Sequence, residues 1–571
     1  MRTRYALIFG RGACRHELRR KAAERGLAIA ADLAEFLLVT EPGAIVLTGD
    51  RTAIVGRLWT SDLRQLGLPD QELERAAAAD DLGLLSARYW GNLVLFTTDS
   101  EGRPRVYRDP SNSVGAFHCP LDGADLFFSD AEFARDLGFF TDAPPDLRFA
   151  VHWLQFPFLK TERAGLERTS EVLAGTWRCS TPGGWVTKLG WNPQDHCSAD
   201  TTITDRAFAV RRLRETALRT VPQQLRPERA HLQLSGGLDS SIIGACLHAA
   251  GKRFAAVHFA TSSPDGDERR FASDAAGSCG VELATILEDE LEPAFDVAVA
   301  RSVLPGANPV LAPIERAILD KALADDAALL VDGGGGDNLF CYLATAAPVL
   351  DALWYGPRGA ARSAVAAVAD VTHSTWWEVA KAAARLQLRA LARSRRWRED
   401  RSYIRGEVLL DQPDSHPWLR AGPLPQGKRE HLETIVQIQH FFDRRIDWAL
   451  PVLHPLMAQP LLELCLAIPS WMWIEGGRDR AVARDAFRDL VPKSVLSRRM
   501  KGSLQGFIRR SFERARPALR ELLLEGELQR SGILERKAVE AVFADGWDSD
   551  APQLRLSEMA SVELWMRSWR G

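Results

Sequence analysis

The sequence predicts an α/β protein in which a layered α+β unit precedes a doubly wound parallel sheet with added helices. Three observations predict this class. Short β-branched and aromatic runs separated by Gly, Asp and Pro dominate residues 1 to about 200. Strand and helix patterns then alternate to residue 331, which is typical of parallel strands joined by crossover helices. Residues from about 342 to 571 are rich in Ala, Leu and Arg, with helical periodicity.

The composition is that of an ordinary globular protein. The 571 residues have a formal net charge of -3, with 46% hydrophobic and 26% charged residues, which excludes disorder and a collagen-like architecture. The length corresponds to about four average domains, but two large ones are expected for an α/β enzyme. Because 72 basic residues balance 75 acidic ones, no overall field would attract nucleic acid, and we expect no nucleic-acid partner.

Hydropathy and cysteine usage indicate the compartment. No segment is apolar over the roughly 20 residues that a membrane-spanning helix needs, and the run 5–9 is too short for a signal peptide. The eight cysteines form no CxxC pair, so we expect reduced, mostly buried thiols. We therefore expect a cytoplasmic protein without a membrane partner. The count of 17 Trp is high, and Trp recurs where proteins bind partners or ligands.

The first unit carries strand patterns at 44–47, 53–59, 89–98 and 124–128, and a helical pattern at 17–35. After Asn192 and Pro193 the sequence turns polar, and Thr204 followed by Asp205 is placed to cap a helix. The boundary is therefore placed near residue 200, which predicts domains at 1–200 and 201–571. The second domain shows strand patterns at 231–234, 254–259, 281–287 and 328–331, and helical patterns from residues 239, 267 and 314.

The segment 235–241, Ser-Gly-Gly-Leu-Asp-Ser-Ser, carries the strongest chemical signal, since it joins a predicted strand to an apolar helix. Its glycines let the backbone approach a phosphate, the helix start offers unpaired N–H groups, and the hydroxyls add donors. The GxxxxGK[ST] pattern is missing, so P-loop hydrolysis is not implied. A carboxylate beside a bound anion needs a cation, which makes Asp239 a candidate Mg²⁺ ligand. The alternative is a plain Gly-Ser turn.

A second glycine cluster at 332–338, Asp-Gly-Gly-Gly-Gly-Asp-Asn, follows the strand pattern at 328–331. Four successive Gly residues cost conformational entropy unless the backbone has to approach something closely. Loops at the carboxyl ends of strands meet at the switch point of a doubly wound sheet. We therefore expect this loop to face 235–241, with Asp337 as the second metal carboxylate. A flexible surface turn is the alternative.

In this context the motifs resemble the asparagine synthetase superfamily. The unit around 235–241 resembles the pyrophosphate loop of ATP-pyrophosphatases, and 332–338 takes the place of the family's SGEGADE loop. Further resemblances are an RDP turn at 108–110, a DE-x-x-YA-like helix start at 267–272, a helix at 448–468 before Pro469, a G-x-x-K-x-x-x-R-like segment at 477–484 and a late R-x-K element at 499–501. The resemblance implies a glutaminase-like (Ntn-type) sandwich at 1–200 and an ATP-pyrophosphatase domain at 201–571.

Two departures from the family pattern are informative. Glutamine-dependent members have Cys as residue 2, where this sequence has Arg2, and 54–58 replaces their NGEIYN segment. We therefore expect no release of ammonia from glutamine, and a sandwich that lacks its nucleophile and serves as a scaffold. The second departure is Gly334, where asparagine synthetases have Glu and β-lactam synthetases have Tyr. A glycine leaves space for a substrate larger than aspartate.

With these departures, the DGGGGDN loop, GRDRAVAR and RRMKG, the sequence most resembles the lasso peptide cyclases. The resemblance implies adenylation of an Asp or Glu side chain of a precursor peptide, whose amino terminus then displaces AMP to close a macrolactam. It implies ATP and Mg²⁺ as cofactors, and a precursor peptide, a leader-processing protease and a leader-recognition protein as partners. The alternatives are a small-molecule amide or β-lactam synthetase, an ammonia-dependent asparagine synthetase, and a non-catalytic binding scaffold.

The resemblance also implies a set of site residues. Those expected at the pyrophosphate are Ser235, Gly236, Gly237 and Ser240, with Mg²⁺ on Asp239 and Asp337. Those that match positions bordering the adenosine are Leu234, Val257 and Gly333. The cations expected to stabilise the reacting phosphate are Lys501, with Arg480, Arg484 and Arg499 as helpers.

The attacking amine must be neutral, and its solution pKa of about 8 leaves a useful fraction unprotonated. Location alone suggests a base among Glu433, Asp447 and His454, and none is assigned. The acyl adenylate requires a dry pocket. The aromatic residues that would wall it are Trp354, Tyr355, Trp376, Trp377, Trp397 and Trp418. The Arg-rich run 393–401 would suit an acidic leader. Ordinary helix packing and a solvated charged face are the alternatives.

Overall fold

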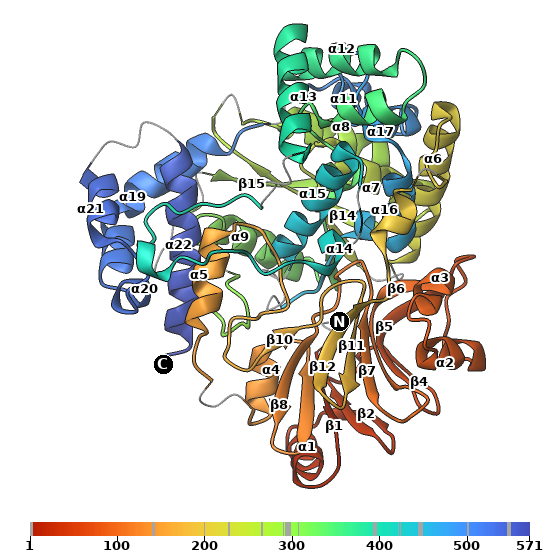
Figure 1. Cartoon of the computed structure of the whole chain (residues 1–571), viewed down its shortest axis with the longest axis vertical. Helices are drawn as coiled ribbons and strands as arrows, with labels where there is room; N and C mark the ends of the chain where they lie inside the picture. The colour runs from red at the N-terminus through yellow and green to blue at the C-terminus, as the bar shows by residue number, and fades with distance from the viewer. Residues whose placement is uncertain are drawn as a thin grey trace.

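The chain folds into an antiparallel β-sandwich, a parallel sheet with helices on both faces, and helical extensions around that sheet (Figure 1). The structure is a computed structural model. It describes residues 4–139, 143–198, 200–225, 229–263, 266–288, 291, 299–306, 308–391, 397–420, 422, 424–442, 449–499, 502–544 and 550–570.

The sandwich is built from the strands β1 (Tyr5–Phe9), β2 (Ala28–Asp32), β3 (Phe36–Thr40), β4 (Val46–Thr48), β5 (Ala53–Thr60), β6 (Tyr89–Thr98), β7 (Pro104–Arg108), β8 (Phe117–Leu121), β9 (Ala124–Phe128), β10 (Ser170–Glu171), β11 (Thr176–Thr181) and β12 (Gly184–Leu189). Their order is β10-β8-β9-β1-β3-β2 in one sheet and β12-β11-β7-β6-β5-β4 in the other. Tyr5 and Phe127 from the first sheet meet Phe96 from the second in a common core. The two sheets therefore pack face to face.

Helices cover the outer faces of this sandwich. Helix α1 (Ala13–Glu24) packs on the first sheet, while α2 (Gln71–Ala78) and α3 (Leu84–Arg88) pack on the second. The remaining helices of this part are α4 (Ala131–Asp136), α5 (Leu147–Gln155) and the 3₁₀ turn η1 (Pro193–His196). The predicted α+β layers are thus present as helix, sheet, sheet and helix.

The local predictions for this part hold for the strands and fail for one helix. Strands β6 and β9 begin and end at the predicted residues, and β4 and β5 differ from the prediction by one or two. The helix predicted at 17–35 is wrong in its second half, because α1 ends at Glu24 and 28–32 form β2. Gly26 has a φ of +64°, the left-handed conformation that ends helices. Pairing with β3 then satisfies the backbone of the Ala-rich segment.

The second sheet system is parallel throughout. Its strands are β13 (Ala230–Gln233), β14 (Phe254–Ala260), β15 (Leu283–Leu287), β16 (Leu329–Val331) and β17 (Val452–Leu453), in the order β15-β14-β13-β16-β17. The chain winds first to one side of β13 and then to the other, so the switch point lies between β13 and β16. The predicted parallel sheet is confirmed. A crevice is expected at the carboxyl ends of these two strands.

Helices lie on both faces of the parallel sheet. Helices α6 (Arg206–Gln223), α7 (Leu238–Ala249) and α8 (Arg269–Cys279) share one core with the strands, and α9 (Ala312–Ala324) belongs to the core on the other face. Helix α6 begins where the sequence predicts, since the Asp205 carboxylate accepts a hydrogen bond from the Ala207 N–H at 2.8 Å.

The helical extensions follow β16. They comprise α10 (Gly336–Leu339), α11 (Ala347–Tyr355), α12 (Ala360–Thr372), α13 (Trp376–Leu391), η3 (Gly406–Val408), α14 (Pro417–Arg420), α15 (Gln426–Phe442), η5 (Pro455–Met457), α16 (Gln459–Ala467), η6 (Ser470–Trp473), α17 (Ala481–Ala486), α18 (Lys493–Leu496), α19 (Gln505–Leu524), α20 (Glu527–Arg530), α21 (Arg536–Ala544) and α22 (Asp550–Ser568). Helices α11 to α13 stand at the top of Figure 1, and α19 to α22 lie together on its left. None of the helices in the described ranges is long and apolar enough to cross a membrane.

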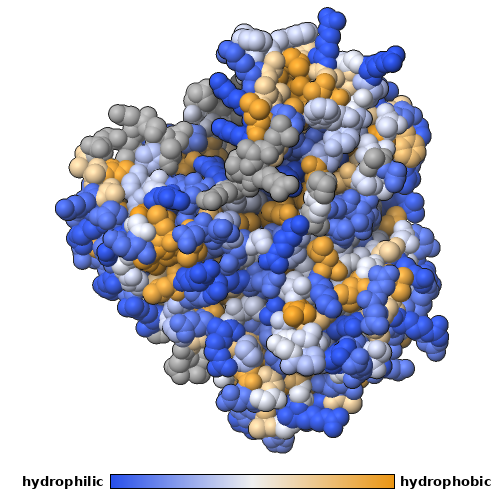
Figure 2. Space-filling model, in the orientation of Figure 1, coloured by the Kyte–Doolittle hydropathy of each residue, from blue (hydrophilic) through white to orange (hydrophobic). Residues whose placement is uncertain are grey.

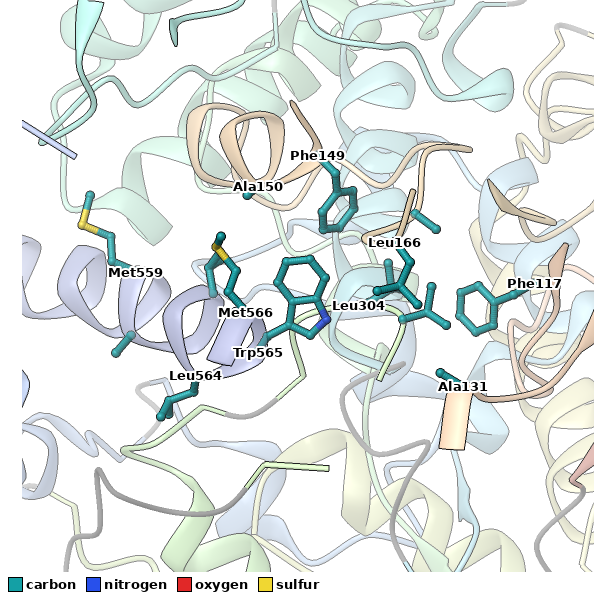
Figure 3. Packing of buried hydrophobic residues seen from close by; sticks show 14 of the residues in the cluster. Phe117, Ala131, Phe149, Ala150, Leu166, Leu304, Met559, Leu564, Trp565 and Met566 are labelled. Carbon is teal, nitrogen blue, oxygen red and sulfur yellow. The ribbon is translucent and has the colours of Figure 1, made fainter. Parts of the chain in front are cut away.

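The last helix returns to the N-terminal part. Figure 3 shows the indole of Trp565, on α22, beside Phe149 of α5 and Leu304. The ring is fully buried, and its N–H donates a hydrogen bond to the Ser302 carbonyl at 2.8 Å. Gly165 is required here, since a Cβ at this position would lie 2.4 Å from the indole. The two ends of the chain are therefore packed into one core.

The side-chain amide of Gln224 is one of the links between the sandwich and the parallel sheet domain. Gln224, just after α6, accepts a hydrogen bond from Asn92 at 3.2 Å and donates one to the Pro455 carbonyl at 2.9 Å. Arg57 donates to the backbone carbonyl of the same residue. The expectation of buried thiols also holds: all eight cysteines are free, and seven are buried.

A buried ion cluster stabilises the sandwich. Arg108 of β7 and Lys160 both contact the carboxylate of Glu171 in β10, at 2.5 and 2.6 Å. All three side chains are almost fully excluded from solvent. Buried charges of this kind need their counter-charges, because removal of one partner leaves another in a low-dielectric interior.

We predict that Glu171→Gln lowers the free energy of unfolding by about 3–5 kcal/mol, because two buried cations lose their counter-charge. Chemical denaturation followed by circular dichroism measures the change. Glu17→Gln is the matched control, since it removes an exposed carboxylate paired with Arg20. Equal unfolding midpoints for Glu171→Gln and the wild type would contradict the assignment.

Candidate active site

A pocket of about 430 Å³ opens at the carboxyl ends of β13 and β16. Both glycine loops line it, as the topology predicts, together with a third segment around α17 and α18. The lining residues are Gln233, Ser235, Gly237, Leu238, Asp239, Ser240, Asp332, Gly333, Gly334, Gly335, Asp337, Asn338, Tyr342, Ile438, Asp479, Arg480, Arg484, Val495, Arg498 and Arg499.

The first loop turns the chain from β13 directly into α7. Gly236 has a φ of +73°, and a Cβ there would lie 2.5 Å from the backbone nitrogen of Ala272. Only glycine fits this turn. The Ser235 hydroxyl accepts from the Gly237 N–H at 3.3 Å, which shapes the loop around the start of α7. The first-turn N–H groups of that helix are left without intrahelical partners and suit an anion.

The second loop passes against the first at van der Waals distance. A Cβ on Gly336 would lie 2.4 Å from Cγ of Asp239, and one on Gly333 would lie 2.9 Å from the nitrogen of Ser240. Gly335, with a φ of +83°, then starts α10. The run of glycines therefore allows the two loops to approach each other closely, and the alternative prediction of a flexible surface turn is wrong.

Arg480 lies between the two predicted metal carboxylates. Its guanidinium is 3.5 Å from Asp239, forms an ion pair with Asp337, and lies over the Tyr342 ring at 5.3 Å. Burial alone would lower the pKa of Arg480, but Asp239, Asp337 and Asp479 outweigh it and raise that pKa. The backbone of Arg480 has a φ of +49°, a conformation that costs about 1–3 kcal/mol in a residue other than glycine.

Asp479 holds two of the predicted arginines. Its Oδ1 accepts from Arg480 Nε at 2.8 Å and from Arg484 Nη2 at 2.9 Å. Arg484 is buried and also donates to the Asp479 and Leu496 carbonyls. Arg484 thus fixes the loop that presents Arg480, while its own contact with phosphate stays a prediction.

Arg499 lines the pocket and is exposed, with no hydrogen bond or ion pair to any other residue that the structure describes. Its neighbour Arg498 pairs with Glu268 and lies 4.4 Å from the centre of the Phe271 ring. Glu268 also accepts a hydrogen bond from the Gly502 N–H at 2.7 Å. Lys501 lies outside the described residues. The Glu268 carboxylate therefore anchors both flanks of the segment that carries it.

Three residues predicted near the nucleotide do not line the pocket. Leu234 and Val257 are fully buried in the cores on either side of the sheet, and Leu234 N–H donates to the Val257 carbonyl at 2.8 Å. Gly236 forms the turn beneath the loop. Sequence reasoning missed Tyr342, and it gave no role to Asn338 and Asp479, although both belong to motifs that it singled out.

The predicted aromatic wall is wrong as a single surface. Trp354, Tyr355, Trp376 and Trp377 are 50–68% exposed on α11 and α13, where Figure 2 shows apolar surface beside hydrophilic side chains at the top of the molecule. In contrast, Trp418 is fully buried against Trp191, and Trp397 donates to the Pro157 carbonyl at 3.0 Å. None of them lines the pocket. Of the Arg-rich run 393–401, residues 393–396 lie outside the described residues, while Arg401 pairs with Glu399 at 2.7 Å.

The fold is α/β, and the two glycine loops meet at the switch point of its parallel sheet, where ligands of this class of fold bind. The family model described as Asparagine synthase matches residues 213–567. Since this match covers more than half of the chain, the protein belongs to the asparagine synthase family and is an ATP-dependent carbon–nitrogen ligase.

Other comparisons add little. A search of curated proteins gives no match. Two solved structures align at 10% identity and a TM-score of 0.20: the allosteric regulatory enzyme of purine biosynthesis, over 51% of this chain and 77% of that chain, and the glutamine phosphoribosylpyrophosphate amidotransferase from B. subtilis complexed with ADP and GMP, over 50% and 81%. Scores this low carry no structural argument.

We predict that Gly336→Ala weakens ATP binding roughly tenfold or more, because the new methyl group would force Asp239 away and overpacking costs about 1–3 kcal/mol. Isothermal titration measures the affinity. Gly277→Ala on α8 is the control, since a Cβ there meets nothing within 4 Å. Unchanged ATP affinity in a folded Gly336→Ala protein would show that the loop contact is not needed.

We also predict that acid loosens the Asp337 loop through His431. This α15 imidazole is hydrogen-bonded to the Leu339 carbonyl of α10 at 2.9 Å, and burial, with Lys428 as a second cause, lowers its pKa to about 3. In the unfolded chain the His pKa is about 6.5, so between about pH 6.5 and 3 the unfolded chain binds a proton at this position and the folded chain does not. The contribution of neutral His431 to the free energy of unfolding therefore falls as the pH drops from about 6.5 toward 3. Urea unfolding between pH 7 and 4 measures it, and His431→Gln should flatten the slope. An unchanged slope would be the contrary result.

Proposed function

We propose that this ligase is a lasso peptide cyclase, which joins an Asp or Glu side chain of a precursor peptide to the peptide's own amino terminus. The observation that carries the proposal is Gly334. A Cβ there would lie 2.8 Å from both Asp332 Oδ1 and His454 Nδ1, so any larger residue would displace this pair. Gly334 lines the pocket at a position where relatives that use small substrates carry Glu or Tyr, and here the Asp332–His454 pair packs against the bare glycine.

The phosphate end of ATP is assigned to the first loop. The α7 N-terminal amides and the hydroxyls of Ser235 and Ser240 would hold the β- and γ-phosphates, leaving the α-phosphorus open to attack. The glycine cradle and the paired oxygen donors of Asp239 and Asp337 suit Mg²⁺, which would neutralise phosphate charge when bound. Arg480 pairs with both carboxylates and would contact phosphate if they bound the metal.

The first chemical step forms the acyl adenylate. An oxygen of the peptide carboxylate attacks the α-phosphorus, and the bond to the β-phosphate oxygen breaks with release of pyrophosphate. Lys501, which lies outside the described residues, is assigned to stabilise the charge that develops, with Arg480 and Arg499 of the pocket lining as helpers. In the second step the terminal amine attacks the acyl carbon and AMP leaves, which forms the amide.

Contacts in the sandwich support a scaffold role. The segment 54–58 belongs to β5, with Ile54 and Val55 fully buried, and Arg57 bonded to the Gln224 backbone. Its side chains are thus committed to packing and to the domain contact rather than to a glutamine site. We propose a leader-processing protease and a leader-recognition protein as partners of the ligase.

The decisive experiment is incubation of the full chain with ATP, Mg²⁺ and precursor core peptides released by a leader protease. The expected product has lost one water, with one AMP formed for each ring closed, as seen by mass spectrometry and nucleotide chromatography. Amidation of free aspartate by ammonia would overturn the cyclase assignment in favour of an asparagine synthetase. Closure of a small-molecule amide would favour the other alternative.

We predict that Asp337→Asn lowers peptide-dependent ATP–pyrophosphate exchange by at least about 10²-fold. The variant loses one of the two carboxylates proposed to bind the Mg²⁺ that neutralises the phosphate charge of ATP. Asp370→Asn on the exposed surface of α12 is the matched control and should retain full exchange. Exchange that survives in Asp337→Asn would remove this residue from the site.

A further inference from the structure

A histidine and an aspartate meet at the carboxyl ends of two neighbouring strands. Strand β16 runs into Asp332, strand β17 runs into His454, and Val331 pairs with Leu453 in register directly before them. Neighbouring parallel strands lie about 4.8 Å apart, so the residues that follow them project side by side at the edge where loops form sites. Parallel pairing, rather than sequence proximity, brings these two residues together.

The contacts of this pair favour one tautomer of the neutral imidazole. His454 Nδ1 lies 2.5 Å from Oδ1 of Asp332, and the same oxygen accepts from the Gly334 N–H at 2.8 Å. A carboxylate held by a backbone amide is an acceptor, so in the neutral imidazole Nδ1 donates to Asp332 and Nε2 is the nitrogen that can accept a proton. The pair is therefore arranged as a base with an orienting partner.

Packing holds the ring and limits its hydration. Phe442, at the end of α15, stacks on the imidazole with centroids 4.0 Å apart and planes at 19°. The side chains of His454 and Asp332 are only 7% and 13% exposed. A base in such a site keeps its orientation through the reaction, and little water competes for it.

The pair also adjoins the phosphate loops. Asp332 and Gly334 line the pocket that contains Asp239 and Arg480, and a Cβ on Gly334 would lie 2.8 Å from His454 Nδ1. Gly334 thus lies directly against the imidazole. The amide-forming step needs a base next to the activated acyl group, and the imidazole lies against two residues of the pocket lining, Asp332 and Gly334.

We propose that His454 is the general base of amide formation and that Asp332 is its positioning residue. This inference rests on the proposed function and assigns the step that follows adenylation. As the amine nitrogen bonds to the acyl carbon, one of its protons passes to Nε2 of His454. The bond between the acyl carbon and the phosphate oxygen breaks, and AMP leaves with that electron pair. The imidazolium, stabilised by Asp332, then returns its proton to solvent.

The test separates the two half-reactions. In His454→Gln, peptide-dependent ATP–pyrophosphate exchange should stay within about threefold of the wild type, while macrolactam formation should fall by about 10²–10⁴-fold, the usual contribution of general base catalysis. Hydroxylamine, a nucleophile that is largely unprotonated at neutral pH, should still trap the adenylate as the hydroxamate at close to the wild-type rate.

A second variant addresses the aspartate. Asp332→Asn keeps an oxygen that can accept the Nδ1 proton but loses the negative charge, so ring closure should fall less than in His454→Gln, again with exchange retained. His248→Gln, an exposed histidine at the end of α7, is the matched control and should behave as the wild type. Thermal unfolding confirms that each variant is folded.

Each other outcome overturns the assignment. Parallel loss of exchange and ring closure in a folded His454→Gln protein would place His454 in nucleotide binding, and retention of both would leave it without a role in catalysis. Loss of hydroxamate trapping together with ring closure would mean that the variant damages the adenylate site. If the wild type shows no peptide-dependent exchange at all, the cyclase function itself fails, which is a distinct result.

Discussion

The close contact between the two glycine loops is the constraint on which the site depends. The backbone at Gly336 passes so near to Asp239 that no side chain fits between them. This approach brings two carboxylates, Asp239 and Asp337, into the lining of one pocket, where like charges repel each other. A cation between them is therefore required. Arg480 meets that requirement, and the ion pairs offset the strain of its left-handed backbone.

The order of the strands in the parallel sheet sets where the residues proposed for each step of the reaction lie. Strands β13 and β16 end in the two loops that surround the phosphate site, and β17 ends beside them at His454. With strands about 4.8 Å apart, adenylation and amide formation lie next to one another along a single sheet edge. An activated peptide would then need only a short movement between the two steps, which limits loss of the adenylate to water.

The sandwich and the helical extensions hold this edge in place. Gln224 links the sandwich to the Pro455 carbonyl, one residue beyond His454, and Trp565 locks the final helix against α5. The exposed aromatic side chains of α11 and α13 take no part in the pocket. Substitutions in the sandwich can therefore change the geometry of the site through the domain contact, without touching a nucleotide or a peptide.

Much of the fold could be predicted because it follows from local sequence patterns. Strand β6, the cap of α6 by Asp205 and the glycine turn at Gly236 each follow from a few neighbouring residues whose conformational preferences agree with the final structure. The prediction of a helix at 17–35 was wrong in its second half, because the sequence pattern there suits a helix and a strand equally well. Pairing with β3 makes that part a strand. The prediction of an aromatic wall was wrong because residue type alone does not show which side of a helix is covered by other parts of the protein.

For the site, the sequence by itself determined which residues have chemistry suited to phosphate and metal, since the glycines, serines and aspartates of the two loops are contiguous. Only the tertiary structure decided how they are used. It placed Arg480 between Asp239 and Asp337, turned Arg484 into a support for Asp479, and joined Asp332 to His454 across 122 residues. Such pairings depend on strand register and packing between distant segments, and these long-range contacts leave no signature in a local pattern.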